Sequence, residues 1–343
     1  MVANSEDYVP NNAEIVTQNI MNEKDDMKVK KKNYKWYEFE TRIVPHQFAI
    51  MAFLQTMFVY YGITFPYREY PVLVAWGFFM TYVNILGVTA GIHRFWSHRT
   101  YKATLPVRIL LALFFYSAGQ MKIRQWSRQH RIHHKYADTD GDPHNARRGF
   151  FFSHIGWLVL EEKPEVDECR QKISVDDVLA DPVVQFFDNN YAIMQTLCIA
   201  VIPSFIPWYF FNQDLKWSII SQVFIRYPLA IHITASVNSF AHMFGYRTYD
   251  KHILPTENFL IALATIGEGW HNYHHAFPWD YRASEFSNFF FNPTTSFLNL
   301  LAKLGLIYDL KYASKDHIEK VIDRKGDGNT KSDKYRYIDQ ILK

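Results

Sequence analysis

The sequence predicts an all-α membrane protein with four transmembrane helices, arranged as two hairpins under a cytosolic helical cap. Two observations indicate this fold class. Four apolar blocks of membrane-spanning length occur in two pairs, each pair is joined by a short turn, and only one block contains a charged residue. Dense groups of histidines then follow the apolar blocks, where packing alone would not require them.

The two ends of the chain are polar. Residues 1–40 include four lysines between positions 28 and 32, so we expect a disordered tail that stays in the cytosol beside the first span. Residues 331–343 are expected to form a polar C-terminal tail. The formal charge of +3 is too small to indicate a nucleic-acid partner. Cys169 and Cys198 lie far apart, which argues against a disulfide framework and against a thiolate zinc site.

The first predicted hairpin consists of spans at about 47–65 and 71–90, both uncharged. The second consists of spans at about 191–211 and 217–240. Arg226 interrupts the last span, so its side chain should face protein or reach the interface rather than meet lipid. The segment from Leu105 to Gly119 is apolar but short and contains Arg108, which favours an interfacial or buried helix.

Four crossings return both hairpins to the side on which they start. The segments 91–190 and 241–330 then form one cap, and together with the hairpins they make a domain at 41–330. The cap sequence between the hairpins is rich in arginine and lysine, so we place the cap and both termini in the cytosol.

Nine histidines fall within this cap or at the ends of the spans that enter it. His271, His274 and His275 have the spacing i, i+3, i+4, which places three side chains on one face of a helix. The same spacing recurs at His130, His133 and His134. The set is completed by His93, His98 and His242.

So many imidazoles indicate metal, because nine ligands exceed the needs of a single ion. Imidazole suits iron, copper, nickel and zinc. We favour two iron ions, because iron with O₂ can attack an unactivated C–H bond and the site would lie beside an apolar, lipid-facing core. Asn238, one turn before His242, could complete the ligand set through a water; a helix–helix hydrogen bond is the alternative.

Other polar residues are assigned supporting roles. Asp138, Asp140 and Asp142 begin like a calcium loop, but Pro143 and Gly149 occupy the positions that require Gly and Glu. These carboxylates are expected to accept hydrogen bonds from imidazoles. His144 and His154 lie outside the cluster spacing and are interpreted as structural.

The sequence closely resembles the membrane acyl-CoA desaturases of animals, and their insect branch in particular. The resemblance spans about residues 45–330. Its motifs are the stretches 91–98, 130–145, 148–154, 238–242 and 267–281, which contain all nine histidines. It implies two irons held by these histidines, a kinked tunnel for the acyl chain, and insertion of a cis double bond into a saturated fatty acyl-CoA. It also implies electrons from cytochrome b5 and its NADH-dependent reductase at the endoplasmic reticulum membrane. No His-Pro-Gly-Gly motif is present, so we expect no fused b5 domain.

The resemblance also assigns substrate contacts. Gln120, Trp126 and Thr234 correspond to residues at the tunnel's kink, Arg128 to a contact on the CoA side, and Thr81 and Ile85 to the tunnel's end wall. The sequence departs from the family pattern near these positions. Met121 replaces Asn, Gln129 replaces Asp, Ala235 replaces Trp, and Glu161 and Glu162 replace a basic pair.

The sequence therefore predicts an O₂-dependent di-iron acyl-CoA desaturase of delta-9 or delta-11 type, acting in lipid or pheromone-precursor biosynthesis. A membrane lipid hydroxylase with a similar histidine set is the first alternative. A metal-transport or other metal-binding membrane protein is the second, but transporters place such residues near the middle of the membrane.

Overall fold

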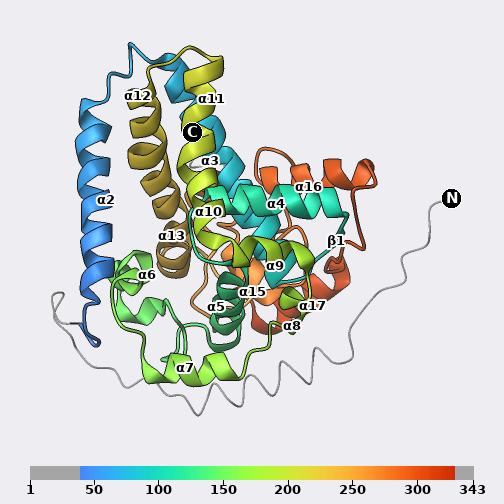
Figure 1. Cartoon of the computed structure of the whole chain (residues 1–343). Helices are drawn as coiled ribbons and strands as arrows, with labels where there is room; N and C mark the ends of the chain where they lie inside the picture. Colours follow the sequence, from blue (N-terminus) through green and yellow to red (C-terminus); the bar gives the residue numbers. More distant parts are fainter. Residues whose placement is uncertain (1–38, 329–343) are drawn as a thin grey trace.

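The computed structural model describes residues 39–328 and is mostly helical (Figure 1). Apart from residues 39 and 40, the predicted polar tails lie outside this range. Long helices run side by side in the upper part of Figure 1, and shorter helices form a second layer beneath them. The histidines predicted to bind metal lie where the two layers meet.

The first hairpin consists of α2 (Pro45–Thr64) and a helix that runs from α3 (Pro71–Leu86) into η1 (Gly87–Ser97), a stretch of wide π-helical turns. Each helix of this hairpin begins with proline, whose fixed φ suits the first turn and whose missing N–H would have no partner there. The bounds agree with the predicted spans, except that the second helix continues through its π-helical turns to the first histidine pair. Such turns often occur at functional sites.

The second hairpin pairs a helix made of α10 (Tyr191–Thr196), η4 (Leu197–Val201) and α11 (Ile202–Phe210) with one made of α12 (Leu215–Ile219), η5 (Ile220–Arg226) and α13 (Tyr227–Met243). The carboxylate of Asp214 caps the second helix by accepting from the N–H of Trp217. Arg226 is buried and donates to the carbonyls of Ser117 and Ile199 at 2.7 and 2.8 Å. It therefore faces protein, as predicted.

Among the described residues, two helices are long and apolar enough to cross a membrane: Pro71–Ser97 and Tyr191–Phe210. The other two predicted spans are also helical. The predicted short helix is α4 (Leu105–Ser117), which lies across the end of α3 (Figure 1). One of its faces is buried and the other exposes Leu105, Ile109 and Leu110.

The remaining elements form the cap. Between the hairpins lie α5 (Ile123–Tyr136), η2 (Ala146–Arg148), α6 (Phe150–His154), η3 (Gly156–Leu158), α7 (Pro164–Gln171), α8 (Asp176–Leu179) and α9 (Pro182–Asn189). After the second hairpin follow α14 (Phe259–Ala264), α15 (His271–Ala276), α16 (Pro293–Lys303) and α17 (Lys315–Lys325). Two short antiparallel strands, β1 (Lys102–Ala103) and β2 (Ile307–Tyr308), pair Lys102 with Tyr308 and so join the two halves of the cap.

The largest hydrophobic cluster holds η1 against α4, α9 and α16, through residues such as Ile92, Leu111, Val184 and Leu298. Gly87 lies where η1 meets α4, and a Cβ at this position would overlap the backbone of Phe114 and Phe115. The close contact therefore requires glycine. This packing fixes the end of the helix that presents His93 and His98.

Candidate metal centre

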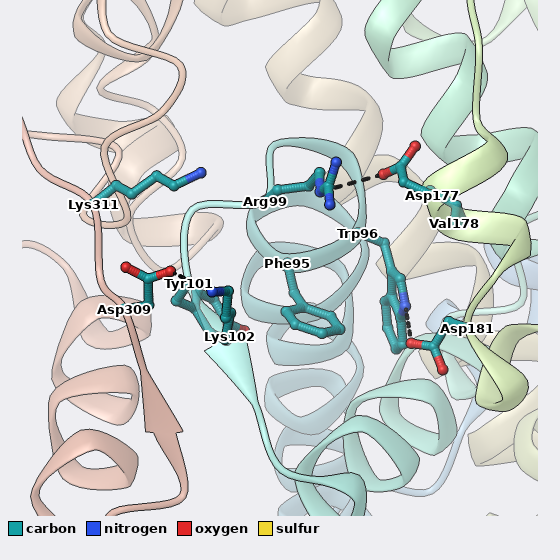
Figure 2. A pocket seen from close by; sticks show the side chains of 10 residues that line it. All are labelled: Phe95, Trp96, Arg99, Tyr101, Lys102, Asp177, Val178, Asp181, Asp309 and Lys311. Atoms are coloured by element: carbon teal, nitrogen blue, oxygen red, sulfur yellow. Dashed lines mark hydrogen bonds and ion pairs between the residues drawn. The ribbon is translucent and has the colours of Figure 1, made fainter. Parts of the chain in front are cut away.

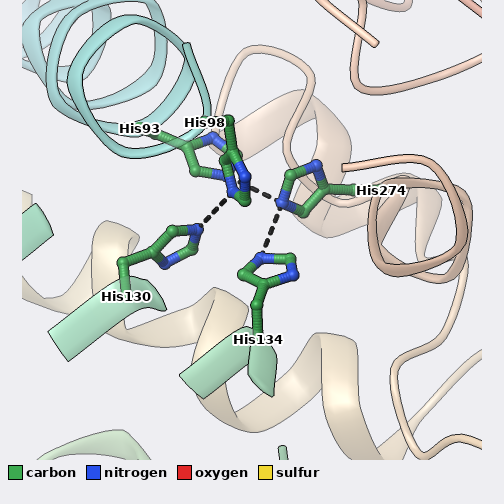
Figure 3. A group of neighbouring side chains, drawn as sticks. All are labelled: His93, His98, His130, His134 and His274. Carbon is green, nitrogen blue, oxygen red and sulfur yellow. Dashed lines mark hydrogen bonds between the residues drawn. The ribbon is translucent and has the colours of Figure 1, made fainter. Parts of the chain in front are cut away.

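Five of the nine predicted histidines form one group (Figure 3). His93 and His98 come from the end of the first hairpin, His130 and His134 from α5, and His274 from α15. Their Nε2 atoms converge. The Nε2 atoms of His93 and His274 are 2.9 Å apart, those of His98 and His130 are 2.8 Å apart, and those of His134 and His274 are 2.9 Å apart.

The other four predicted histidines form a second, mostly buried group. His133 comes from α5, His242 from the end of α13, and His271 and His275 from α15. The Nε2 atom of His271 lies 3.1 Å from those of both His242 and His275. The structure thus brings all nine histidines together and divides them into five and four.

The helical spacing explains this division. On α5, His130 and His134 are one turn apart and enter the five-histidine group, while His133 enters the other group. On α15 the arrangement is reversed: His271 and His275 enter the four-histidine group, while His274 enters the five-histidine group. The i, i+4 pair of each helix serves one group and the i+3 residue serves the other, so α5 and α15 link the two groups.

Buried carboxylates orient three of the rings. The Nδ1 atom of His93 lies 2.9 Å from Glu268, that of His133 lies 3.0 Å from Asp142, and that of His242 lies 3.2 Å from Asp138. A carboxylate beside Nδ1 keeps the proton on that atom and leaves the lone pair on Nε2. The predicted roles of Asp138 and Asp142 are therefore matched by contacts. The same role predicted for Asp140 is wrong, because its carboxylate accepts from Lys163 at 2.6 Å.

Glu268 was not predicted as part of the site. It also pairs with the buried Arg94 at 2.6 Å. Its neighbours Gly267 and Gly269 give a signal that could have drawn attention to it. Gly267 has a φ of 124°, and a Cβ on Gly269 would overlap the backbone of Ala262, so this turn must pack tightly. A carboxylate buried in such a turn needs charged or hydrogen-bonding partners, and Glu268 has them in Arg94 and His93.

The electrostatics of the site favour neutral imidazoles and charged carboxylates. Burial lowers the pKa of six histidines well below 6.5, and neighbouring histidines lower it further: His98, His130, His134, His271, His274 and His275. Burial acts to raise the pKa of Glu268, but Arg94 and His93 outweigh it and bring the pKa to about 2. Converging Nε2 lone pairs repel one another unless a cation lies between them. The donor set therefore fits metal ions, one per group.

Asn238 lies on α13, one turn before His242, and is half-buried. Within residues 39–328, no hydrogen bond joins its amide to another side chain or backbone group, so the alternative of a helix–helix hydrogen bond is not observed. His144 lies closer to the centre than expected, with its ring 4.6 Å from that of His133. His154 instead lies 2.9 Å from the hydroxyl of Ser239 and 3.0 Å from His232.

The residues predicted at the tunnel's kink form a hydrogen-bonded chain beside the five-histidine group. The indole of Trp126 donates to Gln120 at 2.6 Å, and the Gln120 amide donates to Thr234 at 3.1 Å. The Trp126 ring stacks on His130 at 4.9 Å. Thr81 and Ile85, which were predicted at the end wall of the tunnel, lie on a different helix, α3, and both are buried.

Arg128 lines a separate open pocket with Arg170 and Lys172. Of the departures from the family pattern, Glu162 forms an ion pair with Arg170 and accepts a hydrogen bond from Gln129. Glu161 is exposed. Ala235 is buried and Met121 is half-buried.

A helical fold with two adjacent groups of largely buried imidazoles, each able to hold a metal ion, defines a class of protein with a histidine-rich candidate metal centre. Comparison with known proteins places the chain more closely. The model of the fatty acid desaturase family matches residues 69–285, which contain all nine histidines. The chain belongs to this family, and the resemblance predicted from the histidine motifs is confirmed.

Relatives from vertebrates and insects are about equally similar. Stearoyl-CoA desaturase 5 of Bos taurus is 49% identical over 84% of this chain and 85% of its own. The acyl-CoA Delta-12 desaturase of Tribolium castaneum is 46% identical over 78% of this chain and 75% of its own. The acyl-CoA Delta(11) desaturase of Choristoneura rosaceana is 48% identical over 71% of this chain and 72% of its own. The names of the two insect relatives give different positions for the double bond, so similarity alone does not assign the position in this chain.

Proposed function

We propose that the protein is a fatty acyl-CoA desaturase that uses two iron ions and O₂ to insert a double bond into a saturated acyl chain. The observation that carries this proposal is the convergence of nine imidazoles in two adjacent groups, within a chain whose relatives are named acyl-CoA desaturases. Double-bond insertion removes two hydrogen atoms, that is two protons and two electrons, from neighbouring carbons. With two further electrons from a donor and two protons from solvent, O₂ is reduced to two molecules of water.

The five-histidine group would hold one iron and the four-histidine group the other, with Asn238 contributing to the second through a water. Bound iron supplies the O₂-dependent oxidation of an unactivated C–H bond. The protein's own part is to hold neutral rings with Nε2 directed inward. Glu268, Asp142 and Asp138 do this by accepting from Nδ1.

The chain of Trp126, Gln120 and Thr234 would form the bend of the acyl tunnel. These side chains come from α5, the turn before it and α13, and their hydrogen bonds fix the bend relative to the ring of His130. The bend would set which carbons of the chain lie beside the metals. Thr81 and Ile85 would close the tunnel's far end.

The CoA head carries several phosphate charges, so its site should be basic. Arg128, Arg170 and Lys172 line one open pocket and could meet this need. Glu162 lies against Arg170 and neutralises part of that charge. The positive charge that remains on Arg128, Arg170 and Lys172 would compensate for the basic pair that is absent at Glu161 and Glu162.

Four membrane spans, an endoplasmic reticulum location with cytosolic termini, and electron supply by cytochrome b5 and its reductase complete the proposal. The four long helices support the topology, because both hairpins then open toward the layer that holds the histidines (Figure 1). We propose regiochemistry of delta-9 or delta-11 type. Because some relatives are named Delta-12 desaturases, the position of the double bond has to be measured.

Expression in yeast that lacks its own desaturase tests the proposal. We expect growth without added unsaturated fatty acid and monounsaturated acyl chains whose double-bond position is read by mass spectrometry. A His271→Ala variant, present in the membrane in equal amount, should give neither. Hydroxylated acyl chains in place of alkenes would support the hydroxylase alternative, and an unchanged lipid profile would contradict both.

A further inference from the structure

A pocket separate from the histidine groups lies where η1, β1, α8 and the segment after β2 meet (Figure 2). It encloses about 230 Å³. Phe95 and Trp96 contribute aromatic surface, and the lining side chains include three cationic and three acidic groups. The cations are Arg99, Lys102 and Lys311, and the acids are Asp177, Asp181 and Asp309.

The three aspartates already have close partners. Asp177 accepts two hydrogen bonds of 2.7 Å from Arg131, which does not line the pocket. Asp181 accepts from Arg108 at 2.9 Å and from the indole of Trp96 at 3.2 Å. Asp309 pairs with Lys102 at 2.9 Å. The acidic charge of the lining is therefore balanced, largely by groups outside the pocket.

Two cations of the lining, Arg99 and Lys311, are not the main partners of these aspartates. The guanidinium of Arg99 lies 3.5 Å from Asp177, whose shorter contacts are all to Arg131, and its side chain is largely exposed. Lys311 is half-buried, and its amine forms no ion pair or hydrogen bond with any residue between 39 and 328. In Figure 2 its amine extends toward the space beside Arg99. The pocket thus has surplus positive charge at two of the side chains that line it, Arg99 and Lys311.

Burial lowers the pKa of Lys311; Asp309 partly opposes this, while Arg99 and Lys102 lower it further. A bound anion would relieve the repulsion among these cations and stabilise the charged amine.

We propose that this pocket binds a phosphate group, held between Lys311 and Arg99. Arginine and lysine together favour phosphate over a chloride-sized ion, because guanidinium offers paired donors and ammonium a compact charge. The pocket has room for the ester that such a group carries. The source is either a soluble phosphate compound or a lipid headgroup. The exposed apolar side chains of nearby α4, namely Leu105, Ile109 and Leu110, suit contact with lipid.

Calorimetric titration of the iron-loaded, detergent-solubilised protein with inorganic phosphate tests the proposal. Lys311→Met keeps the aliphatic stem but removes the charge, and should weaken binding at least about tenfold. Lys311→Arg should largely retain binding. Lys303→Met removes an exposed charge at the end of α16 and should have no effect. Phosphate binding that is weakened by Arg170→Gln, and not by Lys311→Met, takes place in the other pocket, which Arg128 and Arg170 line.

Nanodiscs distinguish the two sources. If phosphatidic acid in a phosphatidylcholine disc abolishes the Lys311-dependent binding of free phosphate, the natural ligand is a lipid headgroup. If free phosphate binds equally in discs with phosphatidic acid and in discs of phosphatidylcholine alone, the ligand is soluble. The proposal is overturned if no saturable Lys311-dependent binding is seen in detergent, or if Lys311→Met binds phosphate as tightly as the unaltered protein.

Discussion

The imidazole of His93 has its two nitrogens in different surroundings. Its Nδ1 atom lies against Glu268, and its Nε2 atom faces the other rings of the five-histidine group. Glu268 in turn pairs with Arg94, which also donates to Thr295 and to the carbonyl of Tyr281, both at 2.9 Å. A fully buried network of this kind stays ordered only while every charge keeps its partner.

We predict that Glu268→Gln weakens iron binding by about tenfold to a hundredfold, the usual effect of losing a carboxylate behind a metal-binding histidine. The change leaves Arg94 without its anionic partner in a buried position, so the thermal midpoint should also fall. Iron content after dialysis against a graded chelator series measures the first effect. Glu161→Gln, at an exposed carboxylate, is the matched control, and equal iron retention in the two variants would exclude this role for Glu268.

Six of the nine histidines could be predicted to gather because their i, i+3, i+4 spacing places them on one face of a helix. His93, His98 and His242 could be added because they lie at the ends of the predicted spans. The supporting acids were harder to predict. Asp138 and Asp142 contact rings of His242 and His133, whereas Asp140, two residues from each, turns to Lys163. Glu268 is far from His93 in the sequence. Pairing across such distances depends on tertiary packing, which local spacing does not encode.

At the scale of elements, α5 and α7 border the proposed site of the CoA head. Glu162, just before α7, pairs with Arg170 within it, while Arg128 comes from α5. We predict that Glu162→Lys lowers the KM for acyl-CoA several-fold, because it adds a cation and removes one of the two carboxylates that pair with Arg170, the other being Asp167. The effect should shrink as salt is raised. Steady-state assays at two ionic strengths measure it; a KM that rises or stays constant would mean that the head lies elsewhere.

The helix α3 carries the proposed end of the tunnel. Thr81 and Ile85 are one turn apart and both buried, so they face the protein interior and not lipid. Thr81→Tyr should shift preference to shorter acyl chains and Ile85→Ala to longer ones, by roughly 1–3 kcal/mol of discrimination. A competition assay with saturated acyl-CoAs of different length measures this preference. Unchanged profiles in both variants at normal activity would mean that the pair only packs against the neighbouring helix.

At the scale of the whole molecule, the two hairpins and the short α4 could be predicted because apolar length is a property of the sequence alone. The structure adds what hydropathy does not encode. The second helix continues as η1 to the histidines, and the β1–β2 pair joins segments about two hundred residues apart. The division of the histidines into five and four likewise depends on how α5 and α15 face each other.

The buried histidines also make stability depend on pH. Six of them have pKa values below 6.5 in the folded protein, so the unfolded chain binds more protons than the folded one once the pH falls below about 6.5. The free energy of unfolding must then decrease as the pH is lowered. We predict that the thermal midpoint of the metal-free protein drops between pH 7.5 and 5.5; a constant or rising midpoint would contradict neutral, buried imidazoles.

The central claim is that the two histidine groups hold one iron each, and iron content per chain tests it most directly. Elemental analysis of the purified protein should give two irons per chain, and His98→Ala, which removes a ligand from the five-histidine group only, should give one or fewer. His252→Ala, at an exposed histidine outside both groups, should keep two. A single iron in the unaltered protein, or undiminished iron in His98→Ala, would contradict the claim.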